Sequence, residues 1–263
     1  MKKILLLVAL VSIVLNVSAW TKAQDEGIVI FASQHLTPKA KDVVDKYLGD
    51  NYKDDVAYLL SQRKAKSSKY SMEVHRLHLD ANLQPLAVEG DDALKCIEQN
   101  LAIVSAHESH SEADVTEALR IIIDLVCDMH YLSNVRIEGI PHSQKDFTFQ
   151  RRAAGSGVRV NEISSIKWSA LWGSYVKTHR GFFSELWAED LAICHGKKYD
   201  EYTKGTLHDW ATQNGQIVSE IYARVTPEYI MPRIEYLRYE DLNYEMMARA
   251  GLRLAKLLNE AIK

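Results

Sequence analysis

The sequence predicts a single, almost entirely helical domain. One stretch near the middle is apolar on nearly every face, which suits a helix buried inside a domain. Helical segments with recognisable start signals lie on both sides of it. The sequence contains no internal repeat and no low-complexity segment. We therefore expect an all-α fold with a small irregular or hairpin insertion, in which side chains on facing helices build any metal site.

The first nineteen residues read as a secretory signal peptide. Lys2 and Lys3 form a basic start, an apolar run covers residues 4–17, and Val17-Ser18-Ala19 supplies small residues for cleavage. This run is too short for a membrane span, and no other apolar stretch approaches the required length. We expect an exported protein, periplasmic or secreted, whose single domain covers residues 20–263 and begins at Trp20.

Charge and cysteine content exclude two classes of protein. The formal net charge is −3, and loss of the signal peptide removes two lysines, so a polybasic nucleic-acid binder is excluded. Three cysteines (Cys96, Cys127 and Cys194) allow at most one disulfide, so there is no disulfide framework. Stability must come from a hydrophobic core or from metals.

The first half of the chain predicts a series of helices with one extended piece. Thr37 as a cap and Pro38 in the first turn start one of the helices, and Ser111 with Asp114 forms a capping box before the central helix. The predicted elements are helices at Glu26–Gln34, Thr37–Leu48, Asp54–Lys64 and Asp91–Ser105, an extended piece at Val74–Leu79 and a polar loop at His107–His110.

The second half begins with an irregular segment at Ile137–Gly157. Its turn residues and short β-like runs predict a small hairpin between Asp146–Arg151 and Val158–Val160. Helices are predicted after it, at Ile163–Val176, Phe182–Cys194, Thr206–Val225 and Arg233–Ile262.

The central helix carries two carboxylates in an apolar setting. Asp124 and Asp128 are four residues apart within Ile121–Asn134, so they lie on one helical face. Buried charges are rarely left unpaired, and a cation is therefore expected opposite them. The alternatives are a metal ion, an arginine or lysine in an ordinary salt bridge, and a chain-terminal amine. His130 lies off this face and is interpreted either as a residue that supports the ligands or as a packing residue.

Four segments together resemble a known family. They are Trp20 itself, His35–Ala40 (His-Leu-Thr-Pro-Lys-Ala), Asp124–His130 and the closing Ala250–Asn259. In this order and spacing the chain resembles the zinc-dependent single-strand-specific nucleases of fungi, plants and bacteria (the S-one/P-one type, related to zinc phospholipases C). The resemblance implies one helical domain of that type, which hydrolyses phosphoester bonds in single-stranded nucleic acids or 3′-nucleotides. It also implies three zinc ions, two of which activate a water molecule.

The resemblance implies ligands for part of that centre. Trp20 would offer its amine and carbonyl, His75 matches a family histidine, and Asp128 matches the bridging aspartate. Asp25 and Asp124 stand where the family has histidines. Asp124 and Asp128 are the implied catalytic residues. Arg63 or Lys64 falls near the position of a phosphate-binding arginine, although a solvated basic loop explains this pair equally well.

The chain departs from the family at the remaining metal site. Asn134, Ser169 and Gly173 occupy the ligand positions of this site, and this set does not make a zinc site. Ser61 falls near the position of another family aspartate and is a poor ligand. The exchange of nitrogen for oxygen ligands favours fewer ions, or calcium, magnesium or manganese in place of zinc, or none. Two functions remain open: a metal-dependent endonuclease or phosphoesterase with an altered centre, and an inactive pseudo-nuclease that binds a ligand or partner. The sequence leaves the oligomeric state open.

Overall fold

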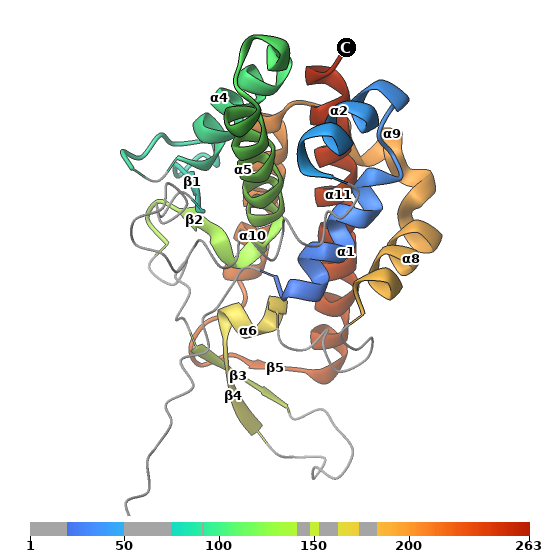
Figure 1. Ribbon diagram of the computed structural model, residues 1–263. Coiled ribbons are helices and arrows are strands. Elements are labelled where there is room, and N and C mark those ends of the chain that lie inside the picture. Colours follow the sequence, from blue (N-terminus) through green and yellow to red (C-terminus); the bar gives the residue numbers. More distant parts are fainter. Residues whose placement is uncertain (1–19, 50–74, 91, 141–147, 153–162, 174–182) are drawn as a thin grey trace, which may run out of the picture.

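The computed structural model describes residues 20–49, 75–90, 92–140, 148–152, 163–173 and 183–263. This part of the chain is mostly helical with a few small strands, as predicted (Figure 1). None of its helices is both long and apolar enough to cross a membrane. The predicted signal peptide, the predicted helix Asp54–Lys64 with Ser61, Arg63 and Lys64, and the strand Val158–Val160 lie outside the described residues.

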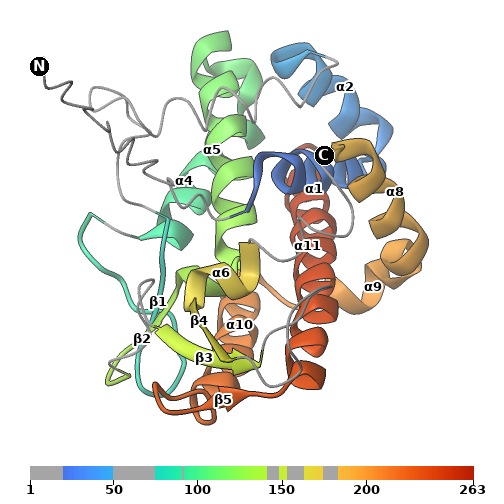
Figure 2. The ribbon, with the colours of Figure 1, turned by 90° about the horizontal axis from the view of Figure 1, so that it is seen from below.

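Two long helices organise the fold. The α-helices are α1 (Lys22–Ser33), α2 (Pro38–Leu48), α4 (Ala93–Ser105), α5 (Glu112–His130), α6 (Trp168–Gly173), α8 (Ser184–His195), α9 (Tyr199–Tyr202), α10 (Leu207–Tyr222) and α11 (Arg233–Ala261), with 3-10 turns η2 (His107–Ser109), η3 (Leu132–Asn134) and η4 (Gly196–Lys198). Helix α5 packs against α4 and α11, and α1 lies between α11 and α8 (Figures 1 and 2). The core is continuous across these contacts.

The helices start where the capping signals predicted. Thr37 accepts a hydrogen bond from the Ala40 amide, with Pro38 in the first turn of α2. The Ser111 side chain accepts from the Asp114 amide at 3.2 Å, which fixes the start of α5. These contacts satisfy amide groups that have no partner within the helix.

The prediction of a helix at Ile163–Val176 is wrong over its first five residues. Residues Ile163–Lys167 form strand β4, which pairs antiparallel with β3 (Thr148–Arg152) and leads into α6. β3 overlaps the first predicted strand, Asp146–Arg151, and also pairs in parallel with β5 (Ile230–Met231). It is therefore the middle strand of a three-stranded sheet at one end of the helices (Figure 1). The three-residue spacing of Ile163 and Ile166 suits a helix, but pairing with β3 satisfies the backbone of this segment and selects the strand.

A second, two-stranded sheet flanks α5. Strand β1 (Leu77–Leu79) pairs in parallel with β2 (Val135–Ile137), and Leu77 lies opposite Val135. Leu77 and Leu79 are buried, and β2 follows α5 after η3. The segment that precedes β1 is thereby held against the C-terminal half of α5.

Candidate metal centre

His75, Asp124 and Asp128 come together in the structure. The His75 Nδ1 atom lies 2.7 Å from Asp128 Oδ2 and 3.6 Å from Asp124 Oδ2. One ligand atom from each of the three side chains lies within 4.8 Å of the others. Both carboxylates are buried, whereas the His75 side chain is 25% exposed. The predicted set of His75, Asp124 and Asp128 is therefore a compact cluster with one side that solvent reaches.

The local fold explains this cluster. The i, i+4 spacing of the two aspartates stacks them on one face of α5, and the apolar residues around them bury that helix. His75 comes from a distant part of the chain and is brought near by the pairing of β1 with β2. The two elements therefore deliver an imidazole and two carboxylates to one point.

Trp20 and Asp25 lie beside the same helix. The Trp20 indole is buried and donates a hydrogen bond from Nε1 to the Cys127 carbonyl at 3.1 Å. Its ring makes an edge contact with Tyr131 at 5.1 Å between centroids. Asp25, in the first turn of α1, is buried, and it is not in the three-residue cluster formed by the described residues.

Tyr131 lies near both Asp128 and Asp25. Burial is the main cause that raises the pKa of its phenol, and the negative charges of Asp128 and Asp25 add to the effect. Both carboxylates therefore lie near one side chain. Tyr131 was not predicted from the sequence as part of the site, although its position three residues after Asp128 places it at the end of the same helix.

Two residues at which the chain departs from the nuclease pattern, Asn134 and Ser169, take part in hydrogen bonds that involve backbone carbonyls. The Asn134 side chain donates from Nδ2 to the Asp128 carbonyl at 3.2 Å, and the Tyr131 hydroxyl donates to the Ser169 carbonyl at 2.7 Å. Gly173 is the last residue of α6. Asn134 and Ser169 are buried, and η3, which contains Asn134, packs against both α5 and α6.

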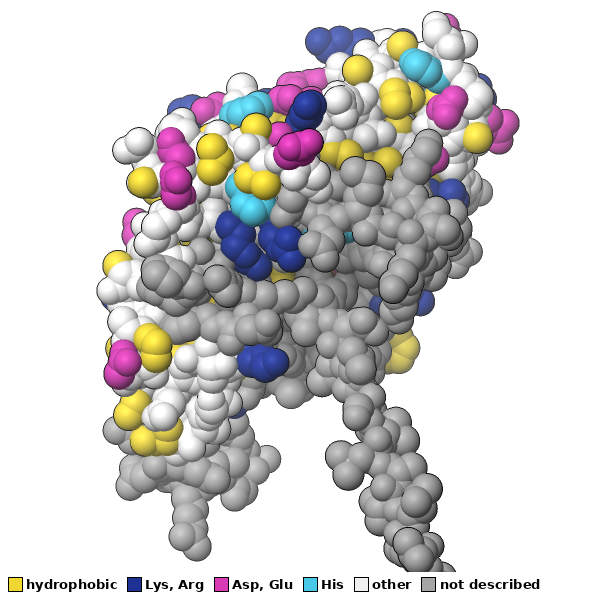
Figure 3. Space-filling model, turned by 90° about the vertical axis from the view of Figure 1, so that its left-hand side faces the viewer, with side chains coloured by type: hydrophobic (Ala, Val, Ile, Leu, Met, Phe, Trp, Pro, Cys, Tyr) yellow, Lys and Arg dark blue, Asp and Glu magenta, His cyan; other side chains and the backbone are white. Residues whose placement is uncertain are grey.

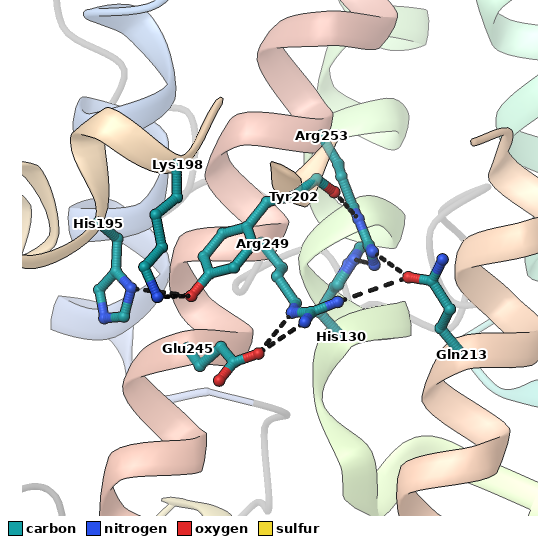
Figure 4. Close-up of polar contacts among 8 residues, drawn as sticks. All are labelled: His130, His195, Lys198, Tyr202, Gln213, Glu245, Arg249 and Arg253. Carbon is teal, nitrogen blue, oxygen red and sulfur yellow. Dashed lines mark hydrogen bonds and ion pairs between the residues drawn. The ribbon is translucent and has the colours of Figure 1, made fainter. Parts of the chain in front are cut away.

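His130 belongs to a separate buried network (Figure 4). Its Nδ1 lies 2.8 Å from the Val126 carbonyl, which can only accept, so Nδ1 carries the proton and Nε2 accepts from Arg253 at 2.9 Å. Burial first, and then the nearby Arg253 charge, lower the pKa of His130 well below its usual value. Of the two roles that the sequence left open for His130, the structure therefore favours packing, with a neutral imidazole.

Arg253 is the centre of that network and was not singled out from the sequence. Its Nε donates to the Tyr202 carbonyl at 2.9 Å, a second guanidinium nitrogen donates to Gln213, and the group lies over the Trp210 ring. Burial lowers the pKa of Arg253 to about 9. An arginine in the apolar pattern of α11 was the available signal.

The donor set of the cluster fits a single divalent cation. One imidazole and two carboxylates are the ligand number and type of a zinc site that keeps a position open for water. Two oxygen ligands out of three also suit manganese, and with added waters magnesium or calcium. Because the His75 side chain is partly exposed, a metal ion or a water molecule can reach the cluster from solvent.

No protein-family model matches the chain, and no curated protein sequence is significantly similar to it. Function must therefore be inferred from the chemistry of the site, because a mostly helical fold by itself supports many activities.

Proposed function

We propose that this protein is an exported, metal-dependent phosphoester hydrolase of the single-strand nuclease type, with a reduced metal centre. The cluster of His75, Asp124 and Asp128 is the observation that carries the proposal. Two carboxylates in a buried helix are costly unless a cation faces them, and a divalent ion satisfies both. Single-stranded nucleic acids or nucleotides are the proposed substrates.

The residues divide into those that hold the ion and those that support them. His75, Asp124 and Asp128 would hold a divalent ion, and the ion would supply a Lewis acid for the activation of water in phosphoester hydrolysis. The Tyr131 hydroxyl donates a hydrogen bond to the Ser169 carbonyl, and its raised pKa keeps it protonated. Tyr131 is therefore neutral and adds no charge near the acids. If Trp20 is the first residue of the mature protein, its amine would lie beside α5, because the Trp20 indole donates a hydrogen bond to the Cys127 carbonyl of that helix.

Contacts between the four resembling segments support the proposed fold. Trp20 bonds to the central helix through Cys127, and Arg253 of the closing segment bonds to His130. The Asn259 side chain accepts from the Thr37 amide at 2.7 Å and donates to the His35 carbonyl at 3.0 Å. Segments that are far apart in the sequence thus form one contact network.

A non-catalytic binding module is the second candidate. It is favoured by Asn134 and Ser169, which stand at ligand positions but contribute to backbone contacts near Asp128 and Tyr131. A centre with one ion instead of a cooperating pair would lose the water-activating arrangement of a two-metal site. The cluster could then bind a cation-linked ligand without turnover.

Elemental analysis of the mature protein that begins at Trp20, purified without chelator, separates these functions. About one equivalent of divalent metal, together with hydrolysis of single-stranded DNA that Asp128→Asn abolishes, is the expected result. Asp241→Asn, an exposed acid on α11, is the matched control and should leave both unchanged. Metal without hydrolysis would favour the binding module, and a metal-free, folded protein would refute the metal centre.

A further inference from the structure

A cavity of about 250 Å³ opens on the outer side of β1. It lies between β1, the β1–α4 connection and the starts of α4 and α10, and its lining residues include Arg76, His78, Leu86, Lys95, Glu98 and His208. Figure 3 looks onto the face that carries β1 and α4, and there basic side chains lie beside a histidine near the middle. None of the catalytic or metal-binding residues discussed above lines this cavity.

The cavity and the metal cluster share one stretch of backbone. Consecutive residues of an extended segment point to opposite sides. His75 points toward α5, where it meets Asp128, and Arg76 lines the cavity. The cavity and the metal cluster therefore lie on opposite sides of one extended segment, at adjacent residues whose Cα atoms are about 3.8 Å apart.

The lining has cationic and apolar parts. Arg76 and Lys95 supply positive charge, whereas Pro85, Leu86 and Ala87 form an apolar wall on which Leu86 is 42% exposed. Two acids also line the cavity, and both have identified contacts. Asp92 caps α4 by accepting from the Lys95 amide at 3.0 Å, and Glu98 lies 3.5 Å from His208.

We propose that this cavity is a subsite for one nucleotide unit. The phosphate would bind to Arg76 and Lys95, and the base would pack on the apolar wall. A free phosphate would leave the apolar wall uncovered, and a purely apolar ligand would gain nothing from the positive charge of Arg76 and Lys95. Its role as a substrate subsite rests on the proposed function, because a cavity on the same segment as the metal cluster would then take one nucleotide unit of the substrate.

The test is isothermal titration calorimetry, in which adenosine 5′-monophosphate is titrated into the mature protein in the presence of chelator. The nucleotide is expected to bind without metal, and adenosine and inorganic phosphate should each bind at least about tenfold more weakly. Arg76→Gln and Lys95→Gln should each weaken nucleotide binding about tenfold. Lys197→Gln, an exposed lysine on η4, is the matched control, and Asp128→Asn should retain binding.

The outcomes distinguish the subsite from the metal centre. Equal affinity in wild type, Arg76→Gln and Lys95→Gln, or no nucleotide binding at all, would overturn the subsite and leave the metal proposal untouched. Binding that follows the prediction while no metal supports hydrolysis would confirm the cavity as a nucleotide site and refute the proposed activity. Circular dichroism of each variant checks that the fold is intact.

Discussion

Metal binding at the cluster should raise the thermal stability of the protein, and Asp128→Asn should remove that effect. The change replaces a carboxylate whose Oδ2 lies 2.7 Å from His75 Nδ1 with an amide of the same shape. It therefore removes a charged ligand with little change in packing. A ligand that binds only the folded state at one hundred times its Kd stabilises it by about 2.7 kcal/mol.

This free energy corresponds to a measurable shift in Tm. For a chain of this length, about 1 kcal/mol shifts Tm by roughly 2–4 °C, so saturating metal should raise the Tm of the wild type by roughly 5–11 °C. Asp128→Asn keeps two of three ligands and should shift by less than about 2 °C at the same metal concentration. Asp124→Asn should behave in the same way.

Differential scanning fluorimetry with zinc, manganese, calcium and magnesium measures these shifts after chelator treatment. Asp241→Asn serves as the control, because its exposed side chain on α11 is not part of the cluster. The metal that gives the largest shift in the wild type identifies the preferred ion. An undiminished shift in both Asp124→Asn and Asp128→Asn would refute the site, since the metal would then bind elsewhere.

Three further predictions concern the scaffold. Arg253→Met should lower the free energy of unfolding by about 3–5 kcal/mol in urea titrations, because buried acceptors of the network lose their donor; a loss below about 1 kcal/mol would contradict this. Gly27→Ala places a Cβ 2.5 Å from Cβ of Trp187 and should cost about 1–3 kcal/mol, whereas Gly196→Ala, with nothing within 4 Å, should cost almost nothing. Burial raises the pKa of four tyrosines in the folded protein. Their contribution to the free energy of unfolding should therefore be complete below about pH 10 and fall above it, where only the unfolded chain releases these protons. Absorbance at 295 nm should show that they are still protonated at about pH 11 in the folded protein. These tyrosines are Tyr131, Tyr222, Tyr236 and Tyr239.

Local signals made most helices predictable. Thr37-Pro38 and Ser111 act within one turn of the helix they start, so the sequence alone determines them. A signal of the same kind was missed at Thr21 and Gln24, whose reciprocal capping box starts α1 at Lys22, before the predicted Glu26. Strand β4 was not predictable in this way, because its conformation depends on pairing with β3.

The site was predictable in the same uneven manner. The spacing of Asp124 and Asp128 is a property of one helix, and the carboxylates do share a face. His75 lies in a different element, and only the resemblance to the nuclease family linked it to them. The cavity beside Arg76 combines β1, α4 and α10, so no single segment of sequence indicates it.

The closing segment, Ala250–Asn259, and the proposed metal ligands bear on different questions. In the closing segment, a Cβ at Gly251 would lie 2.8 Å from Phe31 and 3.2 Å from the Ile28 carbonyl. Because glycine has no Cβ, α11 can approach α1 closely at this position. Arg253 and Asn259 of the same segment hold α11 to other parts of the fold through hydrogen bonds. An active enzyme and an inactive relative need these contacts equally, because both need the same packing. The closing segment therefore bears on how the helices pack, whereas the proposed activity depends on whether the three ligand side chains bind a metal.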